Sequence, residues 1–373
     1  MKLFRIPKAP KMYLDVVKLL AIVLVVFNHS GNNGYKMYLD VPAEPAHSLL
    51  LAFSAFVKIA VPLFFMASGA LLLRREEPYG KVLAGRVAKF AAILVAVTFF
   101  YYADAVLPEG KLRVGDFLIH LYRNDLTGHL WYLYSFLCYL LLLPFLRKLA
   151  QTMQAKDYLL LMVVYQLAQL LPVADYALFR GAAAHTSYLD FFVAADYVVY
   201  PLLGHFIENH GEQEEREETI YVLLFLSALA IFFTMQLMKW RCGIDGGWTS
   251  ANREVYMGRL SMIPAITVFY GMKRLFRRQK GAGSVASVLF VLGSCTFGVY
   301  LFDPKWRGLT QGVRTALAPS IGLYGATVVQ TLCAVAVGLV ATLLFKCVTG
   351  GASLLLQRIR AGLGSVGKER MDV

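Results

Sequence analysis

The stretch 48–73 reads SLLLAFSAFVKIAVPLFFMASGALLL and contains one charged residue, Lys58. A helix of about 20 apolar residues is long enough to cross the hydrocarbon core of a bilayer. Lipid cannot hydrogen-bond to an open backbone, so a spanning segment of this kind has to be helical. The stretch is therefore typical of a membrane-spanning helix.

Apolar stretches of this kind recur along all 373 residues. Hydrophobic residues make up 58% of the chain and charged residues 16%, whereas soluble domains have about 45–50% and about 25%. We therefore predict an all-α, polytopic integral membrane protein with about ten transmembrane helices. The predicted spans are roughly 13–31, 48–73, 86–106, 130–147, 157–174, 190–207, 219–238, 257–273, 285–303 and 321–346.

The lysine and arginine residues are distributed unevenly between the two sides of such a chain. With the N-terminus inside, the cytoplasmic segments hold 23 of the 37, the outer segments 11 and the spans 3. Because cytoplasmic loops carry an excess of basic residues, we predict that both termini are cytoplasmic. The whole chain 1–373 would form one transmembrane domain, with cytoplasmic tails at about 1–12 and about 350–373.

The composition also excludes several classes of protein. The net charge is +13, but the basic residues lie in short clusters between apolar runs, so we predict no nucleic-acid partner. The five cysteines have no metal-site or disulfide spacing, so we predict no metal site. No small-residue cleavage site follows the first apolar run, which we interpret as a retained helix and not as a signal peptide.

The first predicted span carries three ionisable residues, Asp15, Lys18 and His29. Ionisable groups inside a membrane are costly and are candidates for function by default. Their spacing places them on one helical face, with Lys18 and His29 about 16 Å apart along the axis. Neutral histidine can accept a proton, as activation of an alcohol requires. The alternative is structural: Lys18 snorkels, Asp15 caps the helix and His29 lies in the outer interface.

Four segments, in order, resemble the membrane-bound acyltransferase 3 family. They are YLDVVKLLAIVLVVFNHSG (13–31), VPLFFMASGALLLRREEP (61–78), HLWYLYSFLCYLLLLPFL (129–146) and TFGVYLFDP (296–304). The resemblance implies a membrane-bound O-acyltransferase of a bacterial cell (inner or plasma) membrane. Such an enzyme moves an acyl group, usually acetyl, from acetyl-CoA or another acyl-CoA to a hydroxyl of a cell-surface or lipid-linked glycan. It implies His29 as general base, membrane lipid as surroundings and no permanently bound cofactor.

Two positions depart from the family pattern. Lys18 stands where the family usually has arginine, and lysine lacks the bidentate fork of arginine. Asp303 stands where the family commonly has histidine before proline, three residues after Tyr300. Asp303 has either a role in the chemistry or a structural pairing with Lys305 or Arg307.

Two further groups of residues are candidate binding sites. Arg74, Arg75 and Arg86 follow the second span, where they either anchor the protein to lipid or bind the phosphates of the donor. His129, Trp131 and Tyr134 open the fourth span. They are either residues of the aromatic interfacial belt or contacts for the acceptor sugar.

A transporter or flippase of a lipid-linked or amphiphilic substrate is the main alternative function. Many transporters are built from paired repeats with broken helices at matching positions. We find no such internal repeat in the sequence, which favours the enzyme. A third alternative is the membrane half of a sensor or racemase-type fusion.

Overall fold

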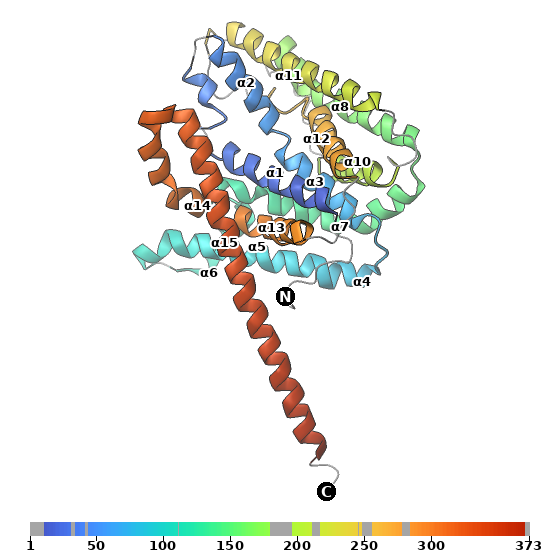
Figure 1. Cartoon of the computed structure of the whole chain (residues 1–373), viewed down its shortest axis with the longest axis vertical. Helices are drawn as coiled ribbons and strands as arrows, with labels where there is room; N and C mark the ends of the chain where they lie inside the picture. Colours follow the sequence, from blue (N-terminus) through green and yellow to red (C-terminus); the bar gives the residue numbers. More distant parts are fainter. Residues whose placement is uncertain are drawn as a thin grey trace. The chain divides into compact units, whose positions relative to one another are not determined.

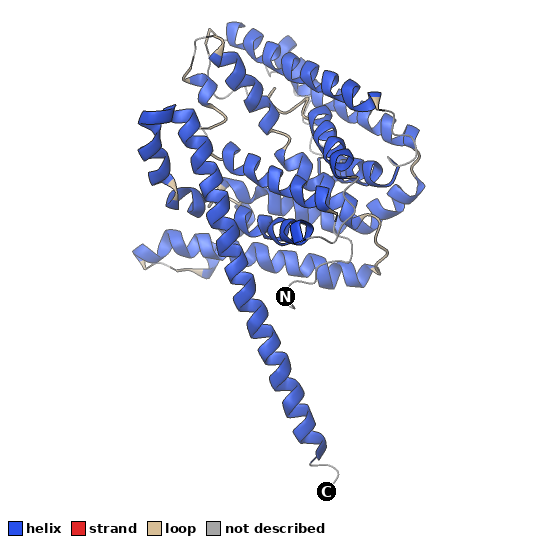
Figure 2. Ribbon diagram, in the orientation of Figure 1, coloured by secondary structure: helices blue, strands red, loops and turns tan. Residues whose placement is uncertain are grey.

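The structure is a computed structural model, and it describes residues 11–30, 34–41, 44–110, 112–179, 196–210, 217–244, 246–247, 256–277 and 284–369. Within these residues every regular element is helical, as Figure 2 shows. The prediction of an all-α protein is therefore confirmed. The chain folds as two compact units: Met1–Val26 with Phe276–Val373, and Phe27–Leu275.

The larger unit, Phe27–Leu275, contains most of the helices labelled in Figure 1. Its α-helices are α2 (Ala46–Val57), α3 (Ala60–Leu72), α4 (Tyr79–Lys81), α5 (Ala88–Val106), α6 (Val114–Arg123), α7 (Trp131–Thr152), α8 (Ala155–Phe179), α10 (Asp196–His210), α11 (Glu218–Ile244) and α12 (Met262–Phe276), the last reaching one residue beyond it. A π-helical segment, Val82–Val87, joins α4 to α5. Short 3₁₀ turns lie at Met37–Leu39, Leu107–Glu109 and Gly128–Leu130.

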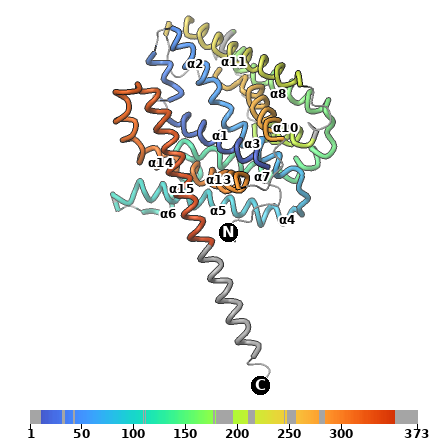
Figure 3. Tube along the Cα trace, in the orientation of Figure 1, coloured from blue at the N-terminus to red at the C-terminus, as the bar shows by residue number. Residues whose placement is uncertain are grey.

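The smaller unit contains most of α1 (Met12–Asn28) together with α13 (Ser284–Leu301), α14 (Asp303–Leu309) and α15 (Gln311–Glu369). Within α15 the chain changes direction at Gly322, whose φ of 75° is unfavourable for a residue with a side chain. The tube reverses direction within α15 in Figure 3. Gly322 therefore separates a short first helix from the long apolar one that follows.

Seven helical stretches within the described residues are long and apolar enough to cross a membrane. They are Ala46–Leu72, Tyr79–Val106, Gly128–Thr152, Ala155–Asp175, Glu218–Ile244, Ser284–Leu301 and Gln311–Gly350. Each overlaps a predicted span. Their length and composition indicate a membrane protein.

The other three predicted spans correspond to shorter helices. α1 has 17 residues, and α10 and α12 have 15 each, whereas a full crossing takes about 20. Part of the predicted span 190–207 lies outside the described residues. The number of about ten spans and the cytoplasmic termini stay predictions.

Close helix packing in the larger unit depends on two glycines, Gly69 in α3 and Gly204 in α10. A Cβ atom at Gly69 would overlap the backbone of Pro201, and one at Gly204 would overlap the backbone of Met66. Small residues let membrane helices approach closely where no hydrophobic force drives them together. The reciprocal overlap shows that α3 and α10 touch backbone to backbone.

We therefore expect Gly69→Ala to destabilise the protein. The added methyl group must push α3 and α10 apart, and overpacking of this kind costs about 1–3 kcal/mol. The apparent Tm in detergent should fall by several degrees, roughly as such a loss implies. Gly115→Ala in α6 is the matched control, because no atom lies within 4 Å of the added Cβ. Equal Tm values for the two variants would show that the α3–α10 contact does not limit stability.

Candidate active site

His29 directly follows the last residue of α1, Asn28, and its side chain is half-buried. The apolar run ends at Phe27, whose carbonyl accepts a hydrogen bond from the Ser30 amide at 3.0 Å. Gly34 returns so close to this turn that a Cβ would lie 2.7 Å from the Phe27 carbonyl oxygen. The turn after α1 is therefore tightly packed and fixes the point from which the imidazole projects.

The imidazole of His129 lies beside that of His29. The two ring centroids are 6.0 Å apart, with the rings at 65° to each other. His129 belongs to the 3₁₀ turn Gly128–Leu130 that precedes α7, and it is buried. Two segments 100 positions apart in the sequence thus bring two proton-transfer groups together.

Tyr101 of α5 completes this cluster on the other side of His129. Its ring centroid is 5.6 Å from that of His129, at 81°, and Tyr101 is itself buried. Edge-to-face ring contacts of this kind orient the rings they join. The cluster of His29, His129 and Tyr101 is hereafter called the histidine cluster.

A lysine lies next to the histidine cluster. Lys58, at the junction of α2 and α3, donates a hydrogen bond from Nζ to the Asn28 side-chain oxygen at 3.0 Å. The same ammonium lies 4.1 Å from the ring centroid of Tyr35, a cation–π distance. A positive charge is therefore held against the residue that precedes His29.

The two aromatic residues predicted beside His129 have partners of their own. Trp131 is exposed and meets Tyr132 edge-on. The Tyr134 hydroxyl donates to the backbone carbonyl of Leu121 in α6. The three predicted acceptor contacts therefore lie in different surroundings, and His129 is the one that contacts the His29 ring in edge-to-face geometry at 6.0 Å between centroids.

In the smaller unit, Asp15 and Lys18 bind each other. Their charged atoms lie 2.6 Å apart, and Asp15 is buried. Asp15 also fills the space left by Gly293 of α13, where an added Cβ would lie 2.7 Å from the Asp15 Oδ1 atom. The carboxylate thus neutralises the lysine and packs α1 against α13.

Tyr300 and Asp303 lie at the end of α13 and the start of α14. Asp303 is fully buried and accepts hydrogen bonds from the Arg307 Nε at 3.1 and 3.2 Å. The pairing with a nearby cation, one of the two predicted alternatives, is therefore present. Tyr300 is buried and stacks on Phe297 at 6.3 Å between ring centroids.

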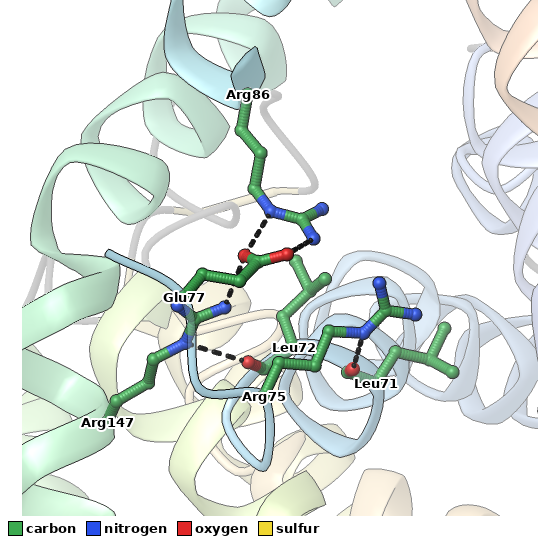
Figure 4. Close-up of polar contacts among 6 residues, drawn as sticks. All are labelled: Leu71, Leu72, Arg75, Glu77, Arg86 and Arg147. Carbon is green, nitrogen blue, oxygen red and sulfur yellow. Dashed lines mark hydrogen bonds and ion pairs between the residues drawn. The ribbon is translucent and has the colours of Figure 1, made fainter. Parts of the chain in front are cut away.

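The three predicted donor-binding arginines have different surroundings. Arg74 and Arg75 are exposed, and Arg75 donates from Nε to the Leu71 carbonyl at 3.1 Å. Arg86 instead donates two hydrogen bonds to the Glu77 carboxylate, at 2.8 and 2.6 Å. Arg147 of α7 binds the same carboxylate at 2.9 Å, so Glu77 lies between two guanidinium groups (Figure 4).

The two arginines stabilise the ionised form of Glu77. Hydrogen bonds from Arg86, and then those from Arg147, lower the pKa of this carboxyl from 4.5 to about 2. Glu77 lies in the irregular connection 75–78 between α3 and α4, outside the apolar stretches. It is therefore ionised throughout the physiological pH range.

Four residues of these sites were not predicted from the sequence: Lys58, Tyr101, Glu77 and Arg147. Lys58 was visible as a single charge inside an apolar span, a signal of function in membranes. Arg147 follows the apolar part of its span and looked like an ordinary basic residue of a helix end. No pattern in the sequence pairs Tyr101 with His129 or Arg147 with Glu77. Among the described residues, no three His, Cys, Asp or Glu side chains are grouped to hold a metal ion.

The ionised Glu77 should make stability depend on pH. A folded-state pKa of about 2 against 4.5 means that its contribution is complete above pH 4.5 and is lost as the pH falls toward 2. The Tm difference between wild type and Glu77→Gln should be constant near neutral pH and should shrink on acidification. Glu76→Gln removes an exposed neighbouring charge and should show no such dependence. A difference that is unchanged down to pH 2 would contradict the ion pair.

Comparison with known proteins identifies the family of the chain. A family model described as an acyltransferase domain, that of the acyltransferase 3 family, matches residues 12–350, nearly the whole chain and both compact units. No curated protein matches the chain. No solved structure matches it either. The chain therefore belongs to the acyltransferase 3 family and is a membrane acyltransferase.

Proposed function

We propose that the protein is an O-acyltransferase of a bacterial inner or plasma membrane. It would move an acyl group, acetyl as the first candidate, from acyl-CoA to a hydroxyl of a cell-surface or lipid-linked glycan. The observation that carries the proposal is the contact between His29 and His129 at 6.0 Å, with Tyr101 against His129. A half-buried imidazole held by aromatic neighbours suits a base that must meet a hydroxyl in one orientation.

In the proposed reaction His29 takes the proton of the acceptor hydroxyl. The hydroxyl oxygen then attacks the thioester carbonyl carbon, a carbon–oxygen bond forms and the carbon–sulfur bond breaks. The proton held by His29 passes to the leaving sulfur, so the products are an ester and free CoA thiol. General base catalysis of this kind contributes roughly 100- to 10,000-fold to the rate.

The separation between the polar groups at the two ends of α7 suits a long donor molecule. His129 precedes the helix, and Arg147 lies 18 residues later, roughly 27 Å further along the axis. A donor that carries phosphates at one end and a thioester on a flexible arm at the other could reach Arg147 with its phosphates and the His129 end with its thioester. Arg74 and Arg75 are exposed near the phosphate end and would add to the attraction.

His29→Ala should therefore slow transfer strongly without unfolding the protein. Membranes containing the full chain are incubated with radiolabelled acetyl-CoA, and label in the glycan fraction and free thiol are both followed. We expect the rate to fall roughly 100- to 10,000-fold. His120→Ala is the matched control, since this histidine of α6 pairs with Asp125 near the surface and should leave the rate unchanged.

Two outcomes would contradict the proposal in different ways. A folded His29→Ala protein that retains the wild-type rate would show that His29 is not the base. A glycolipid that crosses the bilayer without release of free thiol would instead favour the transporter. Replacement of acetyl-CoA by succinyl-CoA in the same assay identifies the acyl group.

A further inference from the structure

The Arg86–Glu77–Arg147 cluster contains a buried donor without an acceptor. Arg147 is 5% exposed. Its Nε donates to the Leu72 carbonyl at 3.0 Å and one Nη donates to Glu77 at 2.9 Å. Its other terminal nitrogen, Nη1, is buried and has no partner among the described residues. A buried guanidinium N–H without an acceptor is costly, because the group has lost its water and gained nothing in return.

A second buried polar group lies within electrostatic reach of both arginines. Tyr139 is fully buried in α7, and its hydroxyl has no hydrogen-bond partner in the described part of the chain. The hydroxyl interacts electrostatically with Arg86 and with Arg147. Arg147 Nη1 and the Tyr139 hydroxyl are thus two buried polar groups that no described residue satisfies, which indicates a site built for a larger acceptor than Glu77.

The charges and oxygen atoms of the cluster lead to the same conclusion. Two guanidinium groups share a single carboxylate, which leaves one positive charge uncompensated. Both oxygens of Glu77 are already used by three N–H contacts. A phosphate offers more oxygens and more negative charge, and arginine forks bind it in a bidentate manner. It could therefore satisfy Arg147 Nη1, which Glu77 does not reach.

The position of Glu77 allows it to be displaced. It lies in the irregular connection 75–78, where its removal breaks no helix hydrogen bond. Arg86, by contrast, is fixed in the π-helical segment Val82–Val87, and Arg147 is fixed in α7. Single π-helical turns are often found at functional sites. The cations are thus held by helices, and only the anion is on a loop.

We propose that Arg86 and Arg147 form a phosphate-binding site in which Glu77 occupies the place of the phosphate until the ligand displaces it. The inference rests on the proposed function, in which the phosphate belongs to the acyl-CoA donor. Glu77 then acts as an internal competitor that sets donor affinity and bridges the two arginines when no donor is bound. A glutamine at this position keeps the shape and removes the competing charge.

The test is direct binding to the purified full-length protein in detergent, measured by calorimetry. Coenzyme A should bind and inorganic pyrophosphate should compete with it, whereas pantetheine, which lacks phosphate, should not bind at this site. Glu77→Gln should tighten coenzyme A binding roughly tenfold, the effect of removing one competing charge in a partly buried site. Glu76→Gln removes a charge one residue away, outside the cluster, and should leave the affinity unchanged.

A second variant distinguishes phosphate binding from a purely structural role of the cluster. Arg147→Lys keeps the positive charge but loses the fork, so binding should weaken roughly tenfold. A purely structural ion pair predicts a different result: Glu77→Gln would weaken coenzyme A binding or leave it unchanged. That result, in a protein that remains folded, would overturn the proposal.

A lipid headgroup is the other source of phosphate. Binding to vesicles of phosphatidylglycerol and of phosphatidylcholine separates the two sources, since only the first lipid carries a net negative charge. Tighter binding of Glu77→Gln to coenzyme A supports the donor. Tighter binding of this variant to phosphatidylglycerol vesicles alone would overturn the assignment to the donor.

The calorimetric readout is independent of acyl transfer. Coenzyme A affinity that depends on Glu77 and Arg147, in a protein that transfers no acyl group to a glycan, would leave the site standing and refute the proposed reaction. Acyl transfer to a glycan, together with a coenzyme A affinity that neither the Glu77 nor the Arg147 substitution changes, would support the proposed reaction and refute the phosphate site.

Discussion

Lipid offers no hydrogen-bond partner, so every polar group that this chain places at membrane depth must find one within the protein. The backbone meets this requirement by forming helices, and the described residues contain no other regular element. Side chains meet it by pairing: Asp15 binds Lys18, and Arg307 binds Asp303. The same constraint makes the exceptions informative. A buried guanidinium nitrogen without an acceptor, such as Arg147 Nη1, is costly enough to suggest that a ligand completes it.

The larger unit combines close packing with two polar sites. Gly69 and Gly204 let α3 and α10 touch, and this contact fixes α3. The carbonyl of Leu72, the last residue of α3, accepts a hydrogen bond from Arg147. Arg147 in turn lies on the helix that begins just after His129. The histidine cluster and the Arg86–Glu77–Arg147 cluster are therefore attached to opposite ends of α7. Such a shared helix can hold two sites at a fixed separation, as a reaction between a long donor and a separate acceptor requires.

Interior pairing also changes the meaning of the charges on the first helix. A lysine and an aspartate in an apolar span suggest a binding site for a charged ligand. In the structure the two neutralise each other, and Asp15 occupies the space above Gly293. Lys58, from a different span, is the cation held against the residue that precedes His29. A lysine in place of arginine at position 18 keeps a one-to-one ion pair with Asp15, for which a bidentate fork is not needed.

The sequence alone determined that the chain is helical and membrane-embedded, because composition and apolar run length are local properties that lipid constrains directly. It also determined the family, through four short segments in order, and it singled out His29 and His129 as separate candidates. Only the tertiary structure decided that these two histidines meet, that Tyr101 lies beside them, and that Glu77 lies between Arg86 and Arg147. Contacts between distant helices depend on how their faces pack, and uniformly apolar faces carry little periodic signal to reveal it.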